Sequence, residues 1–146
     1  MRYLCNSHRA QFINDPHHAA QSWQLIMLQA REVFHIQDWQ KAAIIYGNAF
    51  EISELLLVSN PTAFSVDRYL RTALEFAYAL RKNKVVTNLN PLIPHIKNNI
   101  RNIKHSMAME FLIQPVEEVI NLPIHLSDHW MKSLLSLDNL DHRVLH

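Results

Sequence analysis

The spacing of apolar residues along the chain predicts helices. From Pro16 to about Ile36, apolar residues recur every three or four positions with polar residues between them, which is the period of an amphipathic helix. Asp15 can cap this helix, because its carboxylate accepts free N–H groups of the first turn and Pro16 has no N–H to satisfy. The apolar face consists of Trp23, Ile26, Met27, Ala30, Val33 and Phe34.

A second helix follows almost at once. Asp38 is the next candidate cap, so this helix should fold back on the first as an αα-hairpin and extend to about Val58. Its inward stripe is Trp39, Ala42, Tyr46, Ala49, Ser53 and Leu56. Gly47 lies inside this helix, where glycine costs about 1 kcal/mol relative to alanine. We therefore expect Gly47 to serve a close contact with a neighbouring helix rather than a hinge.

The same period predicts a third and a fourth helix. The third extends from about Ser65 to Lys82, and its inward positions are Val66, Tyr69, Leu70, Ala73, Phe76, Ala77 and Leu80. The fourth begins after the cap and proline signature of Asn90 and Pro91. Its stripe is Ile93, Ile96, Ile100, Ile103 and Met107.

Prolines mark the expected helix boundaries in the last third of the chain. A short helix should start at Pro115, which suits the first turn, and Pro123 should break or kink it. Ser127 or Asp128 can then cap a last helix through Leu137.

Composition supports a fold built from helices alone. The 146 residues include one glycine, where average usage of about 7% would give on the order of ten. Glycine serves tight hairpin turns and bulges, so this scarcity leaves little room for a sheet. We expect one all-α domain over residues 1–146, with about five or six helices in antiparallel αα-hairpins or a helical bundle. Residues 1–14 are a candidate loose arm, and residues 138–146 a candidate loose tail.

The first predicted hairpin resembles a tetratricopeptide-repeat unit over residues 23–56. The resemblance is carried by Leu28, Ala30, Asp38-Trp39-Gln40-Lys41-Ala42, Tyr46, Ala49 and Phe50. It departs from the family pattern at Gln37, where the turn usually has glycine, and in the imperfect register of the first helix. No convincing second copy follows one period of about 34 residues later. The resemblance implies two antiparallel helices that cradle a peptide or a partner protein, and a bundle without repeat ancestry is the alternative.

Charge is unevenly distributed in a chain whose formal net charge is +1. No Asp or Glu occurs from Phe76 to Met109, whereas residues 110–146 carry six acidic residues against two basic ones. The acid-free stretch contains Arg81, Lys82, Lys84, Lys97, Arg101 and Lys104. A near-neutral total therefore conceals a basic segment followed by an acidic one.

The basic segment has three interpretations. A basic helix face with nearby amide side chains can bind phosphates and base edges, which would make residues 81–104 a nucleic-acid-binding surface. The segment can instead be a solvated face that pairs with the acidic C-terminal part. We favour this second interpretation, because nucleic-acid-binding proteins usually carry an overall basic excess. Docking of an acidic partner is the third.

Ten histidines raise the question of a metal site, because neutral imidazole binds metals. Cys5 and His8 have the spacing of half a tetrahedral zinc site. His125 and His129 would share one helical face beside Asp128. Zinc sites usually show two spaced pairs of ligands, so we interpret Cys5 and His8 as chance neighbours in a flexible N-terminus. We interpret His125 and His129 as the polar start of the last helix, and we expect no cofactor.

The sequence contains no recognisable catalytic motif. It lacks a glycine-rich phosphate loop and a Gly-x-Ser-x-Gly elbow, and we predict that the protein is not an enzyme. The leading hypothesis is a protein–protein interaction or adaptor module that presents a groove between helices to a peptide or helix. A nucleic-acid-binding or regulatory protein and a metal-binding helical protein are the alternatives.

Location and assembly are expectations from the same residues. Apolar runs fall short of the ~18–20 residues that span a bilayer. The N-terminus meets charged residues too early for a secretory signal, so we expect a cytoplasmic protein that does not enter a membrane. Apolar side chains around Trp130 and Leu134 could form a homodimer interface.

Overall fold

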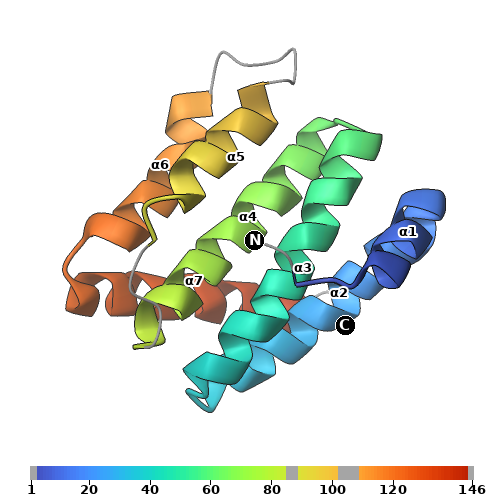
Figure 1. Ribbon diagram of the computed structural model, residues 1–146. Coiled ribbons are helices and arrows are strands. Elements are labelled where there is room, and N and C mark those ends of the chain that lie inside the picture. The colour runs from blue at the N-terminus through green and yellow to red at the C-terminus, as the bar shows by residue number, and fades with distance from the viewer. Residues whose placement is uncertain (1–2, 85–88, 102–108, 145–146) are drawn as a thin grey trace.

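The computed structural model describes residues 3–84, 89–101 and 109–144, and these residues form helices joined by short connections (Figure 1). The helices are α1 (Asn6–Asn14), α2 (Pro16–His35), α3 (Trp39–Ser59), α4 (Ala63–Lys82), α5 (Leu92–Arg101), α6 (Met109–Asn121) and α7 (Ile124–Val144). The all-α prediction is confirmed, but the expected five or six helices become seven within the described ranges. Ile103, Lys104 and Met107 of the fourth predicted helix lie outside the described residues.

Side-chain caps fix the starts of α2, α3 and α4. Asp15 accepts a hydrogen bond from the backbone N–H of His18 at 3.1 Å, and Asp38 accepts one from that of Lys41 at 3.2 Å. Both cap predictions are confirmed. The helix α4 begins at Ala63, two residues before the predicted start, because Thr62 and Ser65 form a reciprocal capping box.

Within the candidate N-terminal arm over residues 1–14, Asn6–Asn14 forms the helix α1. Phe12 of this helix is buried and joins Ile52 and Leu56 of α3 in a small apolar cluster. The helix has little amphipathic pattern of its own, and tertiary contacts dock it: the packing of Phe12 and an ion pair of 3.3 Å between Arg9 and the buried Glu51.

Two expectations for the C-terminal third are also wrong. The helix α6 begins at Met109, so Pro115 lies inside it instead of starting it. Burial of Ile113, Val116 and Val119 against the core offsets the unfavourable effect of an interior proline. The break at Pro123 is confirmed, but α7 begins at Ile124, before the predicted cap at Ser127 or Asp128.

The backbone of Pro123 explains the early start of α7. Its carbonyl accepts the N–H groups of Leu126 at 3.0 Å and of Ser127 at 3.2 Å, which closes the first turn. The helix then continues to Val144, into the candidate tail over residues 138–146.

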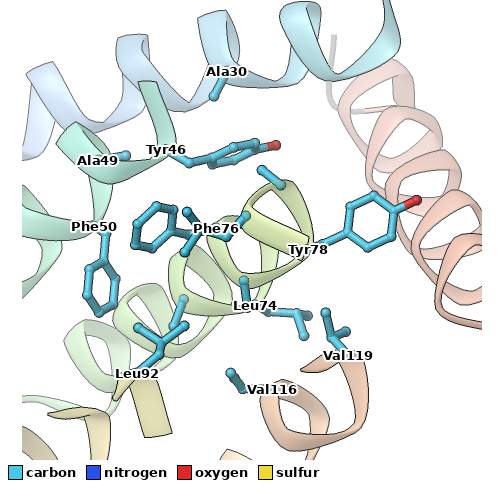
Figure 2. Close-up of a cluster of buried hydrophobic side chains, with 14 of the residues drawn as sticks. Ala30, Tyr46, Ala49, Phe50, Leu74, Phe76, Tyr78, Leu92, Val116 and Val119 are labelled. Carbon is cyan, nitrogen blue, oxygen red and sulfur yellow. The ribbon is translucent and has the colours of Figure 1, made fainter. Parts of the chain in front are cut away.

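The helix α3 packs between α2 and α4, and α4 also packs against α6 (Figure 1). The core follows this arrangement. Figure 2 shows Ala30 of α2, Tyr46 and Phe50 of α3, and Phe76 of α4 converging on one cluster that extends to α5 and α6. The predicted inward stripes are buried or partly buried at their described positions.

Gly47 serves a close contact, but the partner differs from the expected one. A Cβ atom at this position would lie 2.5 Å from the ring of Tyr3, which belongs to the N-terminal segment and not to a neighbouring helix. The Tyr3 ring also packs edge-on against Phe76, with ring centroids 5.6 Å apart. The missing side chain of Gly47 therefore makes room for an aromatic ring at the start of the chain.

One helix of the described part of the chain, α3, is long and apolar enough by length and composition to cross a membrane. Of its most apolar stretch, 67% is buried inside the molecule. Burial on this scale is what a core helix between two neighbours shows, which makes α3 weak evidence for a membrane span.

Candidate functional site

One ridge of α4 includes three side chains that contact α2, those of Arg68, Glu75 and Tyr78. The ridge consists of Phe64, Arg68, Arg71, Glu75, Tyr78 and Lys82, which recur at intervals of three and four and share one helical face. Trp23, Arg31 and Phe34 of α2 contact Thr72, Glu75 and Tyr78 respectively. We call this boundary the α2–α4 seam. At about 1.5 Å per residue the ridge on its α4 side extends about 27 Å from Phe64 to Lys82.

A buried carboxylate lies at the centre of the seam. Glu75 is fully buried, and Arg31 donates to both of its oxygens at 2.9 and 2.8 Å. Arg71 adds a bond of 2.8 Å, and the hydroxyl of Tyr46 donates at 2.9 Å. The helices α2, α3 and α4 therefore meet at one carboxylate.

The surroundings of Glu75 keep it ionised. Burial alone would raise the pKa of its carboxyl, but the hydrogen bond and charge of Arg31, the charge of Arg71 and the bond from Tyr46 lower that pKa below its ordinary value. The pKa of the Tyr46 phenol is raised by burial and by the adjacent Glu75 charge. Glu75 is therefore an anion and Tyr46 a neutral donor at neutral pH.

A cavity of about 480 Å³ opens where the seam meets α7. It is lined by Phe34, His35, Gln37, Trp39, Tyr78, Lys82, Asp128 and Lys132, and we call it the Trp39 pocket. Three aromatic rings form one wall: Phe34, Trp39 and Tyr78 have ring centroids 5.1 to 5.5 Å apart. Figure 2 shows the Tyr78 ring pointing from the core toward α7.

The turn between α2 and α3 contributes Gln37 to the pocket, and this residue has a left-handed backbone with φ of 62°. Left-handed backbone favours glycine, so Gln37 holds a conformation that residues with a side chain rarely adopt.

Charged groups line the Trp39 pocket beside the aromatic rings. The ammonium of Lys82 lies 3.2 and 3.3 Å from the two oxygens of Asp128, and 5.5 Å from the ring centroid of Trp39. The Tyr78 hydroxyl donates to Asp128 as well. Burial raises the pKa of Asp128, but Tyr78, Lys82 and Lys132 outweigh it and lower that pKa. The pocket thus combines aromatic faces, an ionised carboxylate and two lysines.

Three of the six predicted basic residues contact the C-terminal part of the chain. Arg81 donates to the carbonyl of Val119 at 2.7 Å and to Ser127 at 3.2 Å, Lys82 pairs with Asp128, and Lys97 lies 3.4 Å from Glu117. Lys84 and Arg101 are exposed, and Lys104 lies outside the described residues. The arrangement agrees with pairing between the basic segment and the acidic C-terminal part.

The candidate metal ligands lie in two separate places. Cys5 and His8 are exposed, with Sγ and Nδ1 3.1 Å apart. His125 and His129 are exposed on α7, while Asp128 between them faces Tyr78 and Lys82. Within the described residues, no three His, Cys, Asp or Glu side chains come together as a metal would require.

The expected dimer patch is partly used inside the protein. Trp130 and Leu134 are half-buried and pack against the main core cluster.

Sequence reasoning missed three carboxylates that the structure surrounds with donors. Besides Glu75, Glu51 is buried and accepts the N–H groups of Tyr3 and Leu4. Glu54 accepts from His95, and from Asn99 at 2.9 Å. The available signal was an acidic residue inside an apolar stretch of a predicted core helix.

Arg68 is a further residue that sequence reasoning did not single out. Its guanidinium carbon lies 4.9 Å from the ring centroid of Phe64 and 5.7 Å from that of Trp23. No short-range pattern indicates this placement, because Trp23 comes from another helix.

Comparison with protein-family models, with curated proteins and with solved structures finds no match to this chain. The fold and the site define an all-helical protein with a polar and aromatic seam between two helices and a pocket at its end.

Proposed function

We propose that this protein is a non-catalytic interaction module that binds a peptide or helix of a partner protein along the α2–α4 seam. The observation that carries the proposal is the Trp39 pocket. Its volume of about 480 Å³ lies in the range of about 300–1,000 Å³ that is usual for ligand pockets. It can take one anchoring side chain of the partner.

The lining of the pocket suits protein recognition. Tryptophan, tyrosine and arginine dominate the energetics of protein interfaces, because they bury large area and still offer hydrogen bonds. The pocket offers Trp39 and Tyr78 on one side and the charges of Asp128 and Lys132 on the other. The aromatic residues of such a site accept an apolar side chain of the partner, and its charged residues bind polar groups of the partner beside that side chain.

The hairpin-like start of the fold supports the same function. Three residues, 36–38, connect α2 to α3, and Ala42, Tyr46 and Ala49 of the tetratricopeptide-like pattern are fully buried. A tetratricopeptide-like arrangement of these helices is part of the proposal, and it would present α2 and α4 on one side as a peptide-binding face.

The test uses a random peptide library displayed on phage and the full chain as bait. Recovered peptides are then titrated against Lys132→Glu, which changes an exposed pocket residue, and against Lys84→Glu, its matched control outside the pocket. We expect Lys132→Glu to change the peptide affinity by about tenfold. The substitution places a second negative charge beside Asp128, and a tenfold change in affinity is a change of about 1.4 kcal/mol in the free energy of binding.

Recovery of no peptide would contradict the proposal. So would an affinity that Lys132→Glu leaves unchanged. If Lys84→Glu weakens binding and Lys132→Glu does not, the basic segment over residues 81–104 is the binding surface instead.

A further inference from the structure

We propose that Arg68 is a carboxylate-binding subsite for an acidic residue of the partner peptide. The inference rests on the proposed function and adds the chemistry of the partner. Arg68 lies on the seam ridge at the end of α4 opposite the Trp39 pocket, about 21 Å from Lys82 by helical rise. A peptide along the seam would reach both places.

Two aromatic rings contact the guanidinium of Arg68. They belong to Phe64, one turn earlier on α4, and to Trp23 of α2. The Trp23 ring is itself fixed, because its Nε1 donates to Thr72 at 3.0 Å. Stacking between aromatic rings orients a guanidinium without using any of its five N–H donors.

One donor of Arg68 lacks an acceptor. Its Nε is buried and has no hydrogen-bond partner within the described residues. Buried polar groups are normally hydrogen-bonded, and an orphaned donor leaves a desolvation penalty uncompensated. Burial also lowers the pKa of Arg68. A carboxylate of the partner, bound at the terminal amino groups of this partly buried guanidinium, would offset the cost of burying its charge.

Arg68 differs from the two arginines beside it on the seam. Arg31 and Arg71 both bind the buried carboxylate of Glu75. Arg68 is the arginine of the three with an orphaned buried donor. An acidic group of the partner would place a negative charge beside its guanidinium.

The apolar surroundings favour a peptide over a nucleic acid. Phe64 is 70% exposed, and Leu28, one turn before Arg31 on α2, is 48% exposed. A nucleic acid needs several cations in a row to neutralise successive phosphates, whereas two of these arginines already bind Glu75. An acidic residue flanked by apolar residues matches both the charge and the exposed rings.

The experiment uses the full chain and two short synthetic peptides with blocked ends. One peptide repeats glutamate, leucine and serine, and the other has glutamine in place of glutamate. The chain is labelled with ¹⁵N, and the Nε–Hε resonance of Arg68 is followed during each titration. We expect the glutamate peptide to shift this resonance saturably and the glutamine peptide to bind about tenfold more weakly, the factor for one charge-assisted contact.

Arg68→Gln should weaken binding of the glutamate peptide by about tenfold. The affinity of Arg68→Lys for this peptide should lie between those of Arg68→Gln and the parent chain, because lysine keeps the charge but lacks the planar guanidinium. Arg101→Gln removes an equal charge from an exposed position of α5 and is the control. Thermal unfolding of each variant shows whether it is folded.

Equal binding of both peptides would overturn the inference and leave the proposed function intact. The same holds if a folded Arg68→Gln binds the glutamate peptide as well as Arg101→Gln does. If Arg68→Gln weakens binding of a single-stranded oligonucleotide and not of the peptide, the subsite takes phosphate and the inference is wrong. Binding of neither peptide to the parent chain also overturns it, while Lys132→Glu tests the pocket separately.

Discussion

At the scale of single residues, the polar groups that matter most are those that the core surrounds. Glu75 receives hydrogen bonds from Arg31, Arg71 and Tyr46, which come from three helices. A buried ion pair contributes little net stability compared with apolar residues, but removing one partner leaves uncompensated buried charge. Glu75 is therefore a point where one substitution affects three helices.

We expect Glu75→Gln to lower the free energy of unfolding by about 3–5 kcal/mol, because Arg31 and Arg71 lose the carboxylate that binds both of them. Urea denaturation followed by circular dichroism measures the change. The control is Glu118→Gln, which alters a surface pair with Gln114 and should cost less than about 1 kcal/mol. Similar losses in both variants would contradict the role of Glu75.

At the scale of elements, the helix positions follow from local sequence more closely than the docking of the helices does. Asp15 and Asp38 each accept a hydrogen bond from a backbone N–H of the first turn of the helix that they cap. These bonds join residues three apart, so local sequence contains the information. Docking of α1 and of the segment before it depends instead on Glu51, Gly47 and Phe76, which lie on other helices.

The Tyr3–Gly47 contact can be tested by a double-mutant cycle. Gly47→Ala alone should stabilise the chain little or destabilise it, because its Cβ would meet the Tyr3 ring at 2.5 Å. In a Tyr3→Ala background the same change should stabilise by up to about 1 kcal/mol, the difference in helix propensity. Urea denaturation of the four chains gives the coupling energy, and a value near zero would show that the ring does not occupy this space.

Prolines illustrate the limit of local rules for elements. Pro123 separates α6 from α7 as predicted, whereas Pro115 lies inside α6. Both have the same local preference against the helix interior. The difference arises because the residues around Pro115 bury apolar side chains in the core, and Pro123 is exposed at a junction.

At the scale of the whole molecule, ionised carboxylates couple stability to pH. The pKa values of Glu75 and Asp128 are lowered in the folded chain, so the unfolded chain binds more protons at acidic pH. Their contribution is complete above the unfolded pKa of about 4. It is lost as the pH falls through the folded pKa values.

We therefore expect the free energy of unfolding to decrease as the pH falls below about 5. Asp128→Asn removes one of the two groups and should give a shallower decrease, with lower stability at pH 7. Urea denaturation across a pH series measures both slopes. Equal slopes for the parent chain and Asp128→Asn would show that the contacts of Asp128 with Tyr78 and Lys82 do not stabilise its charge.

The sequence by itself determined the all-helical fold, the central residues of the helices α2 to α5, the caps at Asp15 and Asp38, and the break at Pro123. These features depend on glycine scarcity, a period of three to four residues and hydrogen bonds within one turn, which are local properties. Only the tertiary structure decided the length of α6 and α7, the partner of Gly47, the donors around Glu75, the Trp39 pocket and the stacking of Arg68. Each of these joins residues far apart in the chain, and side-chain packing between helices sets their distances.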